Sequence, residues 1–490
     1  MLIKADNVCE ALVAELGLLP GGRVGPRDIS TMAGFDMATR LLLDRERGQL
    51  GAVRDQIKGL RVVLQQIGSE LGTSATSPSL EALCAALAAA DDEPNLAQAE
   101  AAWREIFGQV EALAHGIARD TTLSHETRDR IGALLCAWEE GELSRGLGIL
   151  GDAESDESDK SDDETAIDAA RLQQYLRNRF NEPAIEVTEF RVLPGGFGKQ
   201  MYLFTTEGLA LNGDFVLRRE LHGGPVATEY EVLRAVHARG IPGPEALWLD
   251  LEHELLPGGH FLVMRRAEGV TGGDVFGASV RAPSDLSRRL ARIVAQLHQF
   301  EPLPELAALN ERVNAAQWQR SRGELIREQI EGMFQMFQHM DHLPSPGIAA
   351  LSQWVVERMP SPAGRPVLLH GDIGFHNLLV DGDEFTLLDW ENLHIGDPAE
   401  ELAYIRNTMG ETLDWPTFME EYVAAGGEQV EPKCIAFFQV AAALRNACGA
   451  NMLITKFATG QTADLKALLM HSYIPRFLNA ARTHMEAYPA

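Results

Sequence analysis

The chain has 490 residues, of which 45% are hydrophobic and 23% are charged, as in ordinary globular proteins. At roughly 150 residues per domain, this length predicts two to four domains. The 71 acidic and 43 basic residues give a net charge of −28, which repels the phosphates of nucleic acids and the anionic head groups of lipids. No apolar run approaches the ~20 residues that span a bilayer. We therefore expect no nucleic-acid partner and no membrane partner.

Five cysteines are scattered along the chain, and no two of them form a Cys-x-x-Cys pair. A small, odd and widely spaced set predicts buried, reduced thiols in a cytoplasmic protein. Asp6, Glu10 and Glu15 interrupt the apolar residues at the N-terminus, so we expect no signal peptide.

Residues 1–150 are predicted to form an all-helical accessory domain. Apolar residues recur every three or four positions over 37–71, 96–117 and 127–150, which is the spacing of amphipathic helices. This part of the chain has no cluster of histidines, cysteines or carboxylates that indicates chemistry. Packing or oligomerisation is the expected role, and a homodimer through these helices is one hypothesis.

The segment from Gly151 to Glu164 breaks this pattern, because it holds eight acidic residues and one lysine, a net charge of −7. Such a block cannot bury enough apolar surface to offset the entropy lost on ordering. We predict that residues 151–165 are a disordered acidic linker.

The chain after the linker changes from helices to short strands. Strands are predicted over residues 185–193, 201–206, 214–219 and 260–264, and a helix is predicted over 228–239. Helices dominate from residue 284 onward. This order predicts an α+β fold with a small β-rich lobe over 166–269 and a larger helical lobe over 270–490.

The strongest motif is His-Gly-Asp-Ile-Gly-Phe-His-Asn over residues 370–377, followed by a predicted hairpin that ends at Asp389. Asp372 and Asn377 have the spacing of the catalytic loop H-x-D-x-x-x-x-N in phosphoryl-transfer enzymes. A carboxylate at Asp372 can accept a proton from a hydroxyl group. Asn377 and Asp389 offer the oxygen ligands that Mg²⁺ prefers. Three such residues around one hairpin favour a catalytic role over that of turn residues.

These residues resemble the catalytic segment of the aminoglycoside phosphotransferase family, whose relatives include the choline and protein kinases. The resemblance extends from about residue 189 to residue 406. It implies a bilobal protein-kinase-like fold that uses ATP and Mg²⁺, with Asp372 as catalytic base and Asn377 and Asp389 as magnesium ligands. Glu391 stands where protein kinases have the glycine of Asp-Phe-Gly.

Three upstream features can be matched to nucleotide binding. Gly195, Gly196 and Gly198 lie in a turn that could cradle phosphates, although the segment lacks the Walker spacing. The strand lysine of the family falls on Arg218, which stays charged and can bind phosphate in a bidentate manner. Glu229 lies on the apolar face of its predicted helix, where a carboxylate needs a partner, and this predicts an ion pair with Arg218.

Residues 261–269 resemble the segment that joins the two lobes in this family. The resemblance implies that the backbone at Arg265 and Ala267 forms hydrogen bonds with adenine. Two alternatives stay open at this point. The segment is also typical of a strand that ends in a glycine turn, and Arg219 is the neighbouring alternative to Arg218.

The predicted function is transfer of the γ-phosphoryl group of ATP to a hydroxyl group of a small molecule. One alternative is a metal-dependent hydrolase in which His370, Asp372 and His376 share a metal. The other is a nucleotide-binding pseudokinase with a regulatory role. Arg218 and the Met-Arg-Arg run before Ala267 look most like the non-antibiotic branch of the family whose domains are fused to acyl-CoA dehydrogenases.

Overall fold

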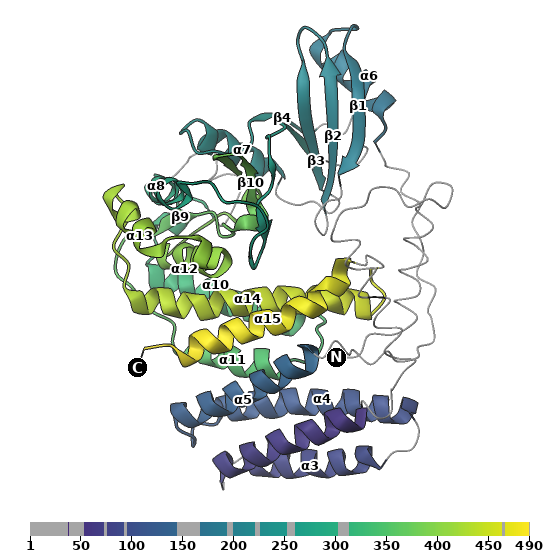
Figure 1. Cartoon of the computed structure of the whole chain (residues 1–490), viewed down its shortest axis with the longest axis vertical. Coiled ribbons are helices and arrows are strands. Elements are labelled where there is room, and N and C mark those ends of the chain that lie inside the picture. Colours follow the sequence, from purple (N-terminus) through teal and green to yellow (C-terminus); the bar gives the residue numbers. More distant parts are fainter. Residues whose placement is uncertain are drawn as a thin grey trace. The chain divides into compact units, whose positions relative to one another are not determined.

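The computed structural model describes residues 38, 53–72, 76–92, 96–144, 167–193, 199–220, 226–251, 260–301, 313–462 and 466–489 (Figure 1). The described residues divide into two compact units. The first unit draws on 1–159, 327–360 and 436–490, and the second unit draws on 160–326 and 361–435. The predicted linker over 151–165 lies outside the described residues.

The first unit is built from helices that pack through apolar faces. Its helices are residues 53–71, α3 (Ser77–Asp91), α4 (Leu96–Arg119), α5 (His125–Ser144), most of α10 (Arg322–His339), α11 (Pro346–Glu357), most of α14 (Pro432–Ala458) and α15 (Lys466–Glu486). Helix α4 packs on α11, and α5 packs on α11 and α15. The predicted amphipathic helices are present over 53–71, 96–117 and 127–144, and the rest of the predicted ranges, 37, 39–52 and 145–150, lies outside the described residues. Trp103, Phe107 and Trp138 form an aromatic cluster between α4 and α5.

The first unit combines helices that the sequence places in two different domains. Helices α11, α14 and α15 belong to the predicted helical lobe over 270–490, yet all three lie in the first unit, where α11 packs on α4 and α5 and α15 packs on α5. Periodicity shows that a helix has a buried face but does not show which helix covers it. The domain limits at 150, 165 and 269 and the homodimer stay predictions.

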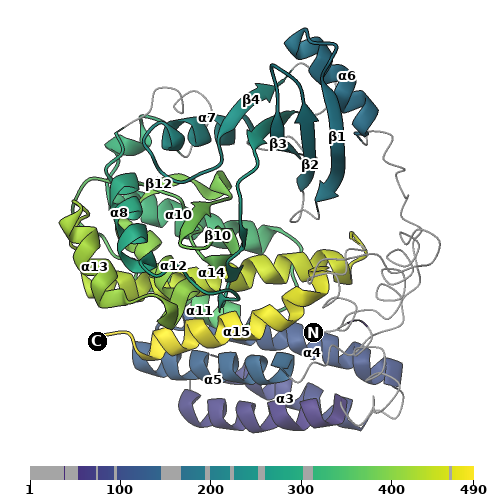
Figure 2. The ribbon, with the colours of Figure 1, turned by 45° about the horizontal axis from the view of Figure 1, so that its top comes forward.

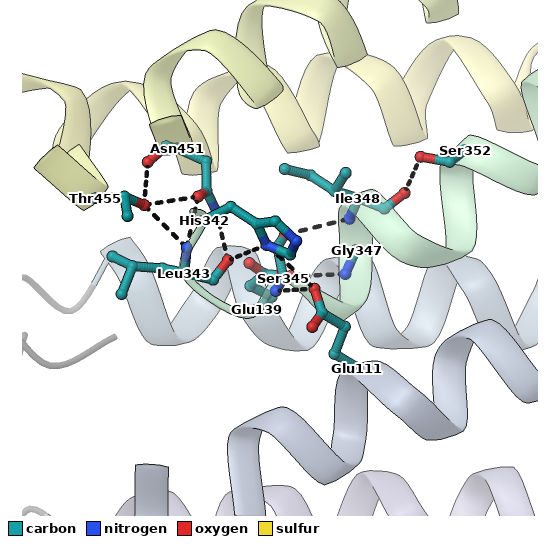
Figure 3. Close-up of polar contacts among 10 residues, drawn as sticks. All are labelled: Glu111, Glu139, His342, Leu343, Ser345, Gly347, Ile348, Ser352, Asn451 and Thr455. Carbon is teal, nitrogen blue, oxygen red and sulfur yellow. Dashed lines mark hydrogen bonds and ion pairs between the residues drawn. The ribbon is translucent and has the colours of Figure 1, made fainter. Parts of the chain in front are cut away.

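A buried carboxylate, Glu139, and a half-buried one, Glu111, hold the start of α11 within the first unit (Figure 3). Glu139 of α5 accepts a hydrogen bond of 2.7 Å from the backbone N–H of Gly347, and Glu111 of α4 accepts one of 2.9 Å from that of Ser345. The hydroxyl of Ser345 in turn accepts from the N–H of Ile348. The first N–H groups of a helix have no partner within the helix, so these carboxylates satisfy donors that would otherwise be buried alone.

The turn before α11 is held from the opposite side by α14. The backbone N–H of Leu343 donates to Asn451 and Thr455, and the amide of Asn451 donates back to the carbonyl of Leu343 at 2.9 Å (Figure 3). Three helices from distant parts of the sequence therefore bind one turn through its backbone.

We predict that Glu139 makes the stability of the first unit depend on pH. Burial raises the pKa of this carboxyl from 4.5 to about 7, against the lowering effect of the Gly347 and Ser345 hydrogen bonds. The folded state thus holds a proton that the unfolded state releases, so this contribution is present below pH 4.5 and is lost as the pH rises to 7. A Glu139→Gln variant needs no proton, and we expect it to lose about 2 kcal/mol less stability than wild type between pH 5 and 7.5.

Thermal melting of the full chain at both pH values measures this difference. Glu105→Gln is the control, because Glu105 is exposed on α4. Parallel pH profiles for wild type and Glu139→Gln would contradict the prediction.

The second unit contains a five-stranded antiparallel sheet in the order β1-β2-β3-β5-β4. Its strands are β1 (Glu186–Leu193), β2 (Lys199–Glu207), β3 (Gly213–Glu220), β4 (Ala246–Asp250) and β5 (Phe261–Arg265). Helix α6 (Ala169–Phe180) contacts β1, and α7 (Val226–His237) contacts β3, β4 and β5 (Figure 2). The strands expected from the sequence are present, whereas β4 and α6 were not predicted.

The rest of the second unit is mainly helical and carries a small hairpin. Its elements are β6 (Val270–Thr271), β7 (Gly273–Asp274), β8 (Gly277–Ala278), α8 (Leu286–His298), η2 (Gln317–Gln319), β9 (Val367–Leu369), η3 (Phe375–Asn377), β10 (Leu378–Asp381), β11 (Glu384–Leu387), η4 (Trp390–Asn392), β12 (His394–Gly396), α12 (Pro398–Met409), η5 (Gly410–Thr412) and α13 (Trp415–Ala424). An antiparallel sheet followed by helices confirms the predicted α+β class. No helix in the described part of the chain is long and apolar enough to cross a membrane.

Candidate active site

The loop after β9 turns sharply at Gly371. This residue has φ +81°, and a Cβ atom there would lie 2.7 Å from the carbonyl oxygen of Asn392. Both the backbone conformation and the close approach require glycine. The turn directs the next residue, Asp372, away from β9.

The Asp372 carboxylate is held by two residues of η3. Asn377 donates through Nδ2 to Oδ2 of Asp372 and to its backbone carbonyl, each at 3.0 Å. Nε2 of His376 lies 3.3 Å from Oδ1. Because two acceptors face Nδ2 of Asn377, the Oδ1 atom of Asn377 is the atom of this side chain that can serve as a metal ligand.

The hairpin of β10 and β11 brings Asp389 to the end of the sheet where Asn377 lies. Leu378 pairs with Leu387, and the backbone N–H of Leu388 donates to the carbonyl of Asn377 at 2.9 Å. Asp389 follows with φ +61°, one of two non-glycine residues with positive φ in the described part of the chain. Such backbone strain is commonly kept at functional sites.

Arg218 of β3 lies beside Asp389 and forms the ion pair with Glu229 that the sequence predicts. Both side chains are almost fully buried, at 5% and 3% exposed. Its Nη1 also lies 3.6 Å from Oδ1 of Asp389. Arg219 lies on the opposite face of the strand, so Arg218 is the arginine that reaches α7.

Glu391 also contacts Arg218, beside Glu229 and Asp389, and the sequence did not predict this contact. Its Oε2 lies 3.4 Å from Nη2 of Arg218, and its side chain is 30% exposed. The available signal was its place two residues after Asp389, where the glycine of protein kinases is replaced. The contact itself joins residues 173 positions apart, which no local pattern reports.

Glu401 of α12 is another residue that the sequence did not predict at this site, and it holds the loop of residues 370–377, the Asp372 loop. Its fully buried carboxylate accepts hydrogen bonds from the backbone N–H groups of His370 at 2.7 Å and Gly371 at 3.0 Å. His298 lies 3.9 Å away and contacts the hydroxyl of Tyr422. Burial raises the pKa of Glu401, but the His298 and His370 side chains and the backbone donor outweigh it and hold the pKa below its ordinary value.

His370 connects the Asp372 loop to Leu388, the residue before Asp389. Its Nε2 donates to the carbonyl of Leu388 at 3.0 Å, and its Nδ1 accepts from the N–H of Asp372 at 3.3 Å. Both ring nitrogens are thus used by the backbone. Because both nitrogens are engaged, the His370 side chain is not placed as the metal ligand that the hydrolase alternative requires. Among the residues that the structure describes, no group of three His, Cys, Asp or Glu side chains could hold a metal ion.

Two other regions that the sequence predicts to contact the nucleotide stay predictions. Gly195, Gly196 and Gly198 lie outside the described residues. At the predicted hinge, the backbone N–H of Arg265 donates to the carbonyl of Glu245 at 2.9 Å. Any bond from Arg265 to adenine must therefore use its carbonyl oxygen, and the roles of Arg265 and Ala267 stay predictions.

The five-stranded sheet, the helices that follow it and the Asp372 loop define a kinase-like phosphotransferase fold. A model of the phosphotransferase enzyme family matches residues 189–438, just over half of the chain, and the chain belongs to this family. The predicted resemblance to the aminoglycoside phosphotransferases is confirmed. A structure from Ralstonia eutropha, assigned as an aminoglycoside phosphotransferase, matches with a TM-score of 0.50 at 16% identity. It covers 66% of this chain and 100% of that one.

Two of the sequence relatives share one name. The chain is 28% identical over 214 residues to acyl-CoA dehydrogenase family member 11 of Gallus gallus, and 24% identical over 201 residues to the Homo sapiens protein of that name. These matches cover 41% and 39% of this chain. They span about a quarter of the length of each relative. The names agree with the branch that Arg218 and the hinge suggest.

We predict that Glu401→Gln makes the Asp372 loop, residues 370–377, more mobile. Glutamine replaces one acceptor oxygen by an NH₂ group, which would face a backbone donor in a buried position. We expect the free energy of unfolding to fall by about 2–4 kcal/mol. We also expect amide hydrogen exchange in residues 367–378 to become faster. Hydrogen-exchange mass spectrometry of the full chain measures the second effect. Glu420→Gln is the control, because Glu420 is exposed on α13. Unchanged exchange in residues 367–378 of Glu401→Gln would contradict the prediction that Glu401 holds this loop.

Proposed function

We propose that the protein is an ATP- and Mg²⁺-dependent kinase that phosphorylates a hydroxyl group of a small molecule. The observation that carries this proposal is the gathering of Asp372, Asn377, Asp389 and Arg218 around one end of the β10–β11 hairpin. Family membership supports phosphoryl transfer as the reaction class.

Asp372 is the proposed catalytic base. Asn377 and His376 hold its two carboxylate oxygens, so the carboxylate has a fixed direction and is still 19% exposed to solvent. A carboxylate in this state can orient the acceptor hydroxyl and take its proton as the new phosphate ester bond forms.

Asn377 and Asp389 are the proposed magnesium ligands. The donor set fits the ion, because an amide oxygen and a partly exposed carboxylate are hard ligands and the hairpin places them at one end. When bound, Mg²⁺ neutralises the negative charge on the nucleotide phosphates. The described residues supply two ligands, as expected for a site that the nucleotide completes.

Residues on and beside the five-stranded sheet are proposed to hold the nucleotide. Arg218, fixed by Glu229, is the proposed contact for the α- and β-phosphates. The backbone of Gly195, Gly196 and Gly198 is proposed to contact phosphates, and that of Arg265 and Ala267 to contact adenine.

The acceptor is proposed only as a class, a hydroxylated small molecule. Hydroxyacyl compounds deserve testing first, because the relatives carry an acyl-CoA dehydrogenase name. A screen of ATP consumption over hydroxyacyl-CoAs, other hydroxylated metabolites and aminoglycosides would identify the acceptor.

We predict that Asp372→Ala lowers kcat by at least about 10³-fold with the best acceptor, because the hydroxyl loses its base and its orienting partner. Nucleotide affinity, measured by calorimetry, should change little. Asp381→Ala is the control, since Asp381 is the exposed last residue of β10 in the same hairpin. Equal turnover by Asp372→Ala and wild type, or nucleotide binding with no turnover in wild type, would exclude this mechanism and favour the pseudokinase.

We predict a magnesium requirement that depends on Asp389. Chelation should abolish turnover and added Mg²⁺ should restore it, and Asp389→Asn should raise the half-saturating Mg²⁺ concentration by about tenfold or more. Asp381→Asn serves as the control. Tightly bound Zn²⁺ or Mn²⁺ in the purified protein without nucleotide, found by metal analysis, would instead favour the hydrolase.

A further inference from the structure

A row of buried polar side chains connects helix α13 with the Asp372 loop. Tyr422 of α13 and Glu401 of α12 are fully buried, and His298 at the end of α8 is 4% exposed. Oη of Tyr422 lies 2.7 Å from Nδ1 of His298, and Nε2 of His298 lies 3.9 Å from Oε2 of Glu401. Because Glu401 binds the backbone N–H of residue 371, the row ends at the residue before Asp372.

Apolar packing places His298 and Tyr422 inside the core of the second unit. His298 continues the buried face of α8 that Leu290 and Val294 begin, eight and four residues earlier. Its ring meets the ring of Tyr422 edge-on, and the Tyr422 ring stacks on Phe418, one turn earlier in α13. Polar atoms in such a core need hydrogen-bond partners, so the direction of each contact in the row matters.

The contacts of Tyr422 indicate which nitrogen of His298 carries its proton. The phenol oxygen accepts a hydrogen bond from the backbone N–H of Glu428. Burial raises the pKa of this phenol, so Oη keeps its own proton and donates it to Nδ1 of His298. The imidazole N–H is then on Nε2, the nitrogen that faces Glu401.

The other end of the row is fixed by a buried arginine. The carboxylate of Glu428 accepts hydrogen bonds from both terminal nitrogens of Arg322, at 2.9 and 2.5 Å. Arg322 is 2% exposed and also donates to the carbonyls of Ala363 and Arg365. Because Glu428 is held in this way, its backbone N–H fixes the direction of the Tyr422 hydroxyl.

The carboxylate of Glu401 gains from a third donor. Its two oxygens accept one backbone N–H each, from His370 on Oε2 and from Gly371 on Oε1. A carboxylate has about four acceptor positions, and an ionised one that is removed from water is costly unless further donors face it. The N–H of His298 faces Oε2. An ionised carboxylate also binds backbone N–H groups more strongly than a neutral acceptor does.

We propose that His298 and Tyr422 are positioning residues for Asp372. Tyr422 directs the N–H of His298 at Glu401, and Glu401 holds the backbone of the Asp372 loop. The effect of both residues on the reaction therefore passes through Glu401. This inference rests on the proposed function, because it takes Asp372 as the catalytic base.

Two substitutions of His298 test the proposal, because each keeps one of its nitrogen positions. Glutamine places an amide near the position of Nε2 and can still donate to Glu401, whereas asparagine reaches only as far as Nδ1. We expect kcat to fall at least about tenfold in His298→Asn and less than about threefold in His298→Gln. KM for ATP should stay within about threefold in both variants, because the proposed nucleotide contacts are other residues. Release of ADP from Mg²⁺-ATP, with water and with a hydroxyacyl-CoA as acceptor, measures these constants.

Tyr422→Phe tests the far end of the row, because it removes the hydroxyl and keeps the stacked ring. We expect kcat to fall about threefold or more. Hydrogen-exchange mass spectrometry should show faster exchange in residues 367–378 of both Tyr422→Phe and His298→Asn. Glu420→Gln, exposed on α13, is the control and should change neither quantity. Thermal melting of each variant shows that it is folded.

Three results would overturn the inference. Equal losses of kcat in His298→Asn and His298→Gln would show that the ring acts through packing and not through its donor to Glu401. Unchanged exchange in residues 367–378 of Tyr422→Phe would show that the row does not hold the loop, and this variant decides the question even where His298→Asn does not fold. A rise in KM for ATP with constant kcat would place the effect on nucleotide binding instead.

Failure of the proposed function gives a different result. Wild type would then consume no ATP with any acceptor of the screen described above, and the predicted effect on kcat would be rejected with it. Faster exchange in residues 367–378 of Tyr422→Phe would still show that Tyr422 and His298 hold the Asp372 loop.

Discussion

The buried charge of Arg218 is the constraint on which the site depends. A guanidinium that is almost completely removed from water is costly unless carboxylates surround it. Its partners come from α7 and from the segment around η4, so one side chain of β3 ties the sheet, the helix and the end of the hairpin together. The geometry of the proposed phosphate and metal site follows from this single requirement.

The Asp372 loop, in contrast, is held by hydrogen bonds from side chains to backbone groups. Glu401 binds the backbone of His370 and Gly371, and His370 binds the backbone of Leu388 and Asp372. Because backbone groups carry this network, the carboxylates of Asp372 and Asp389 keep part of their surface for ligands. A loop whose backbone is held in place and whose carboxylates are partly exposed is what preorganised phosphoryl transfer needs.

The sequence predicted the parts of this site that local spacing determines. The interval between Asp372 and Asn377 indicated the loop, and the buried face of the helix at Glu229 indicated its pair with Arg218. Glu391 and Glu401 were beyond such reasoning, because their partners are brought to them only when the chain has folded. The helices of the first unit show the same limit, since their pattern reports a buried face without its partner.

The acid excess of the chain has a local consequence rather than a global one. A net charge of −28 spread over the surface is screened beyond about 10 Å, so most of it does not act on the carboxylates around Arg218. The carboxylates that touch Arg218 are within this range and are screened much less, because the arginine between them is buried. The local field at the proposed phosphate site is therefore set by these contacts rather than by the acid excess of the whole chain.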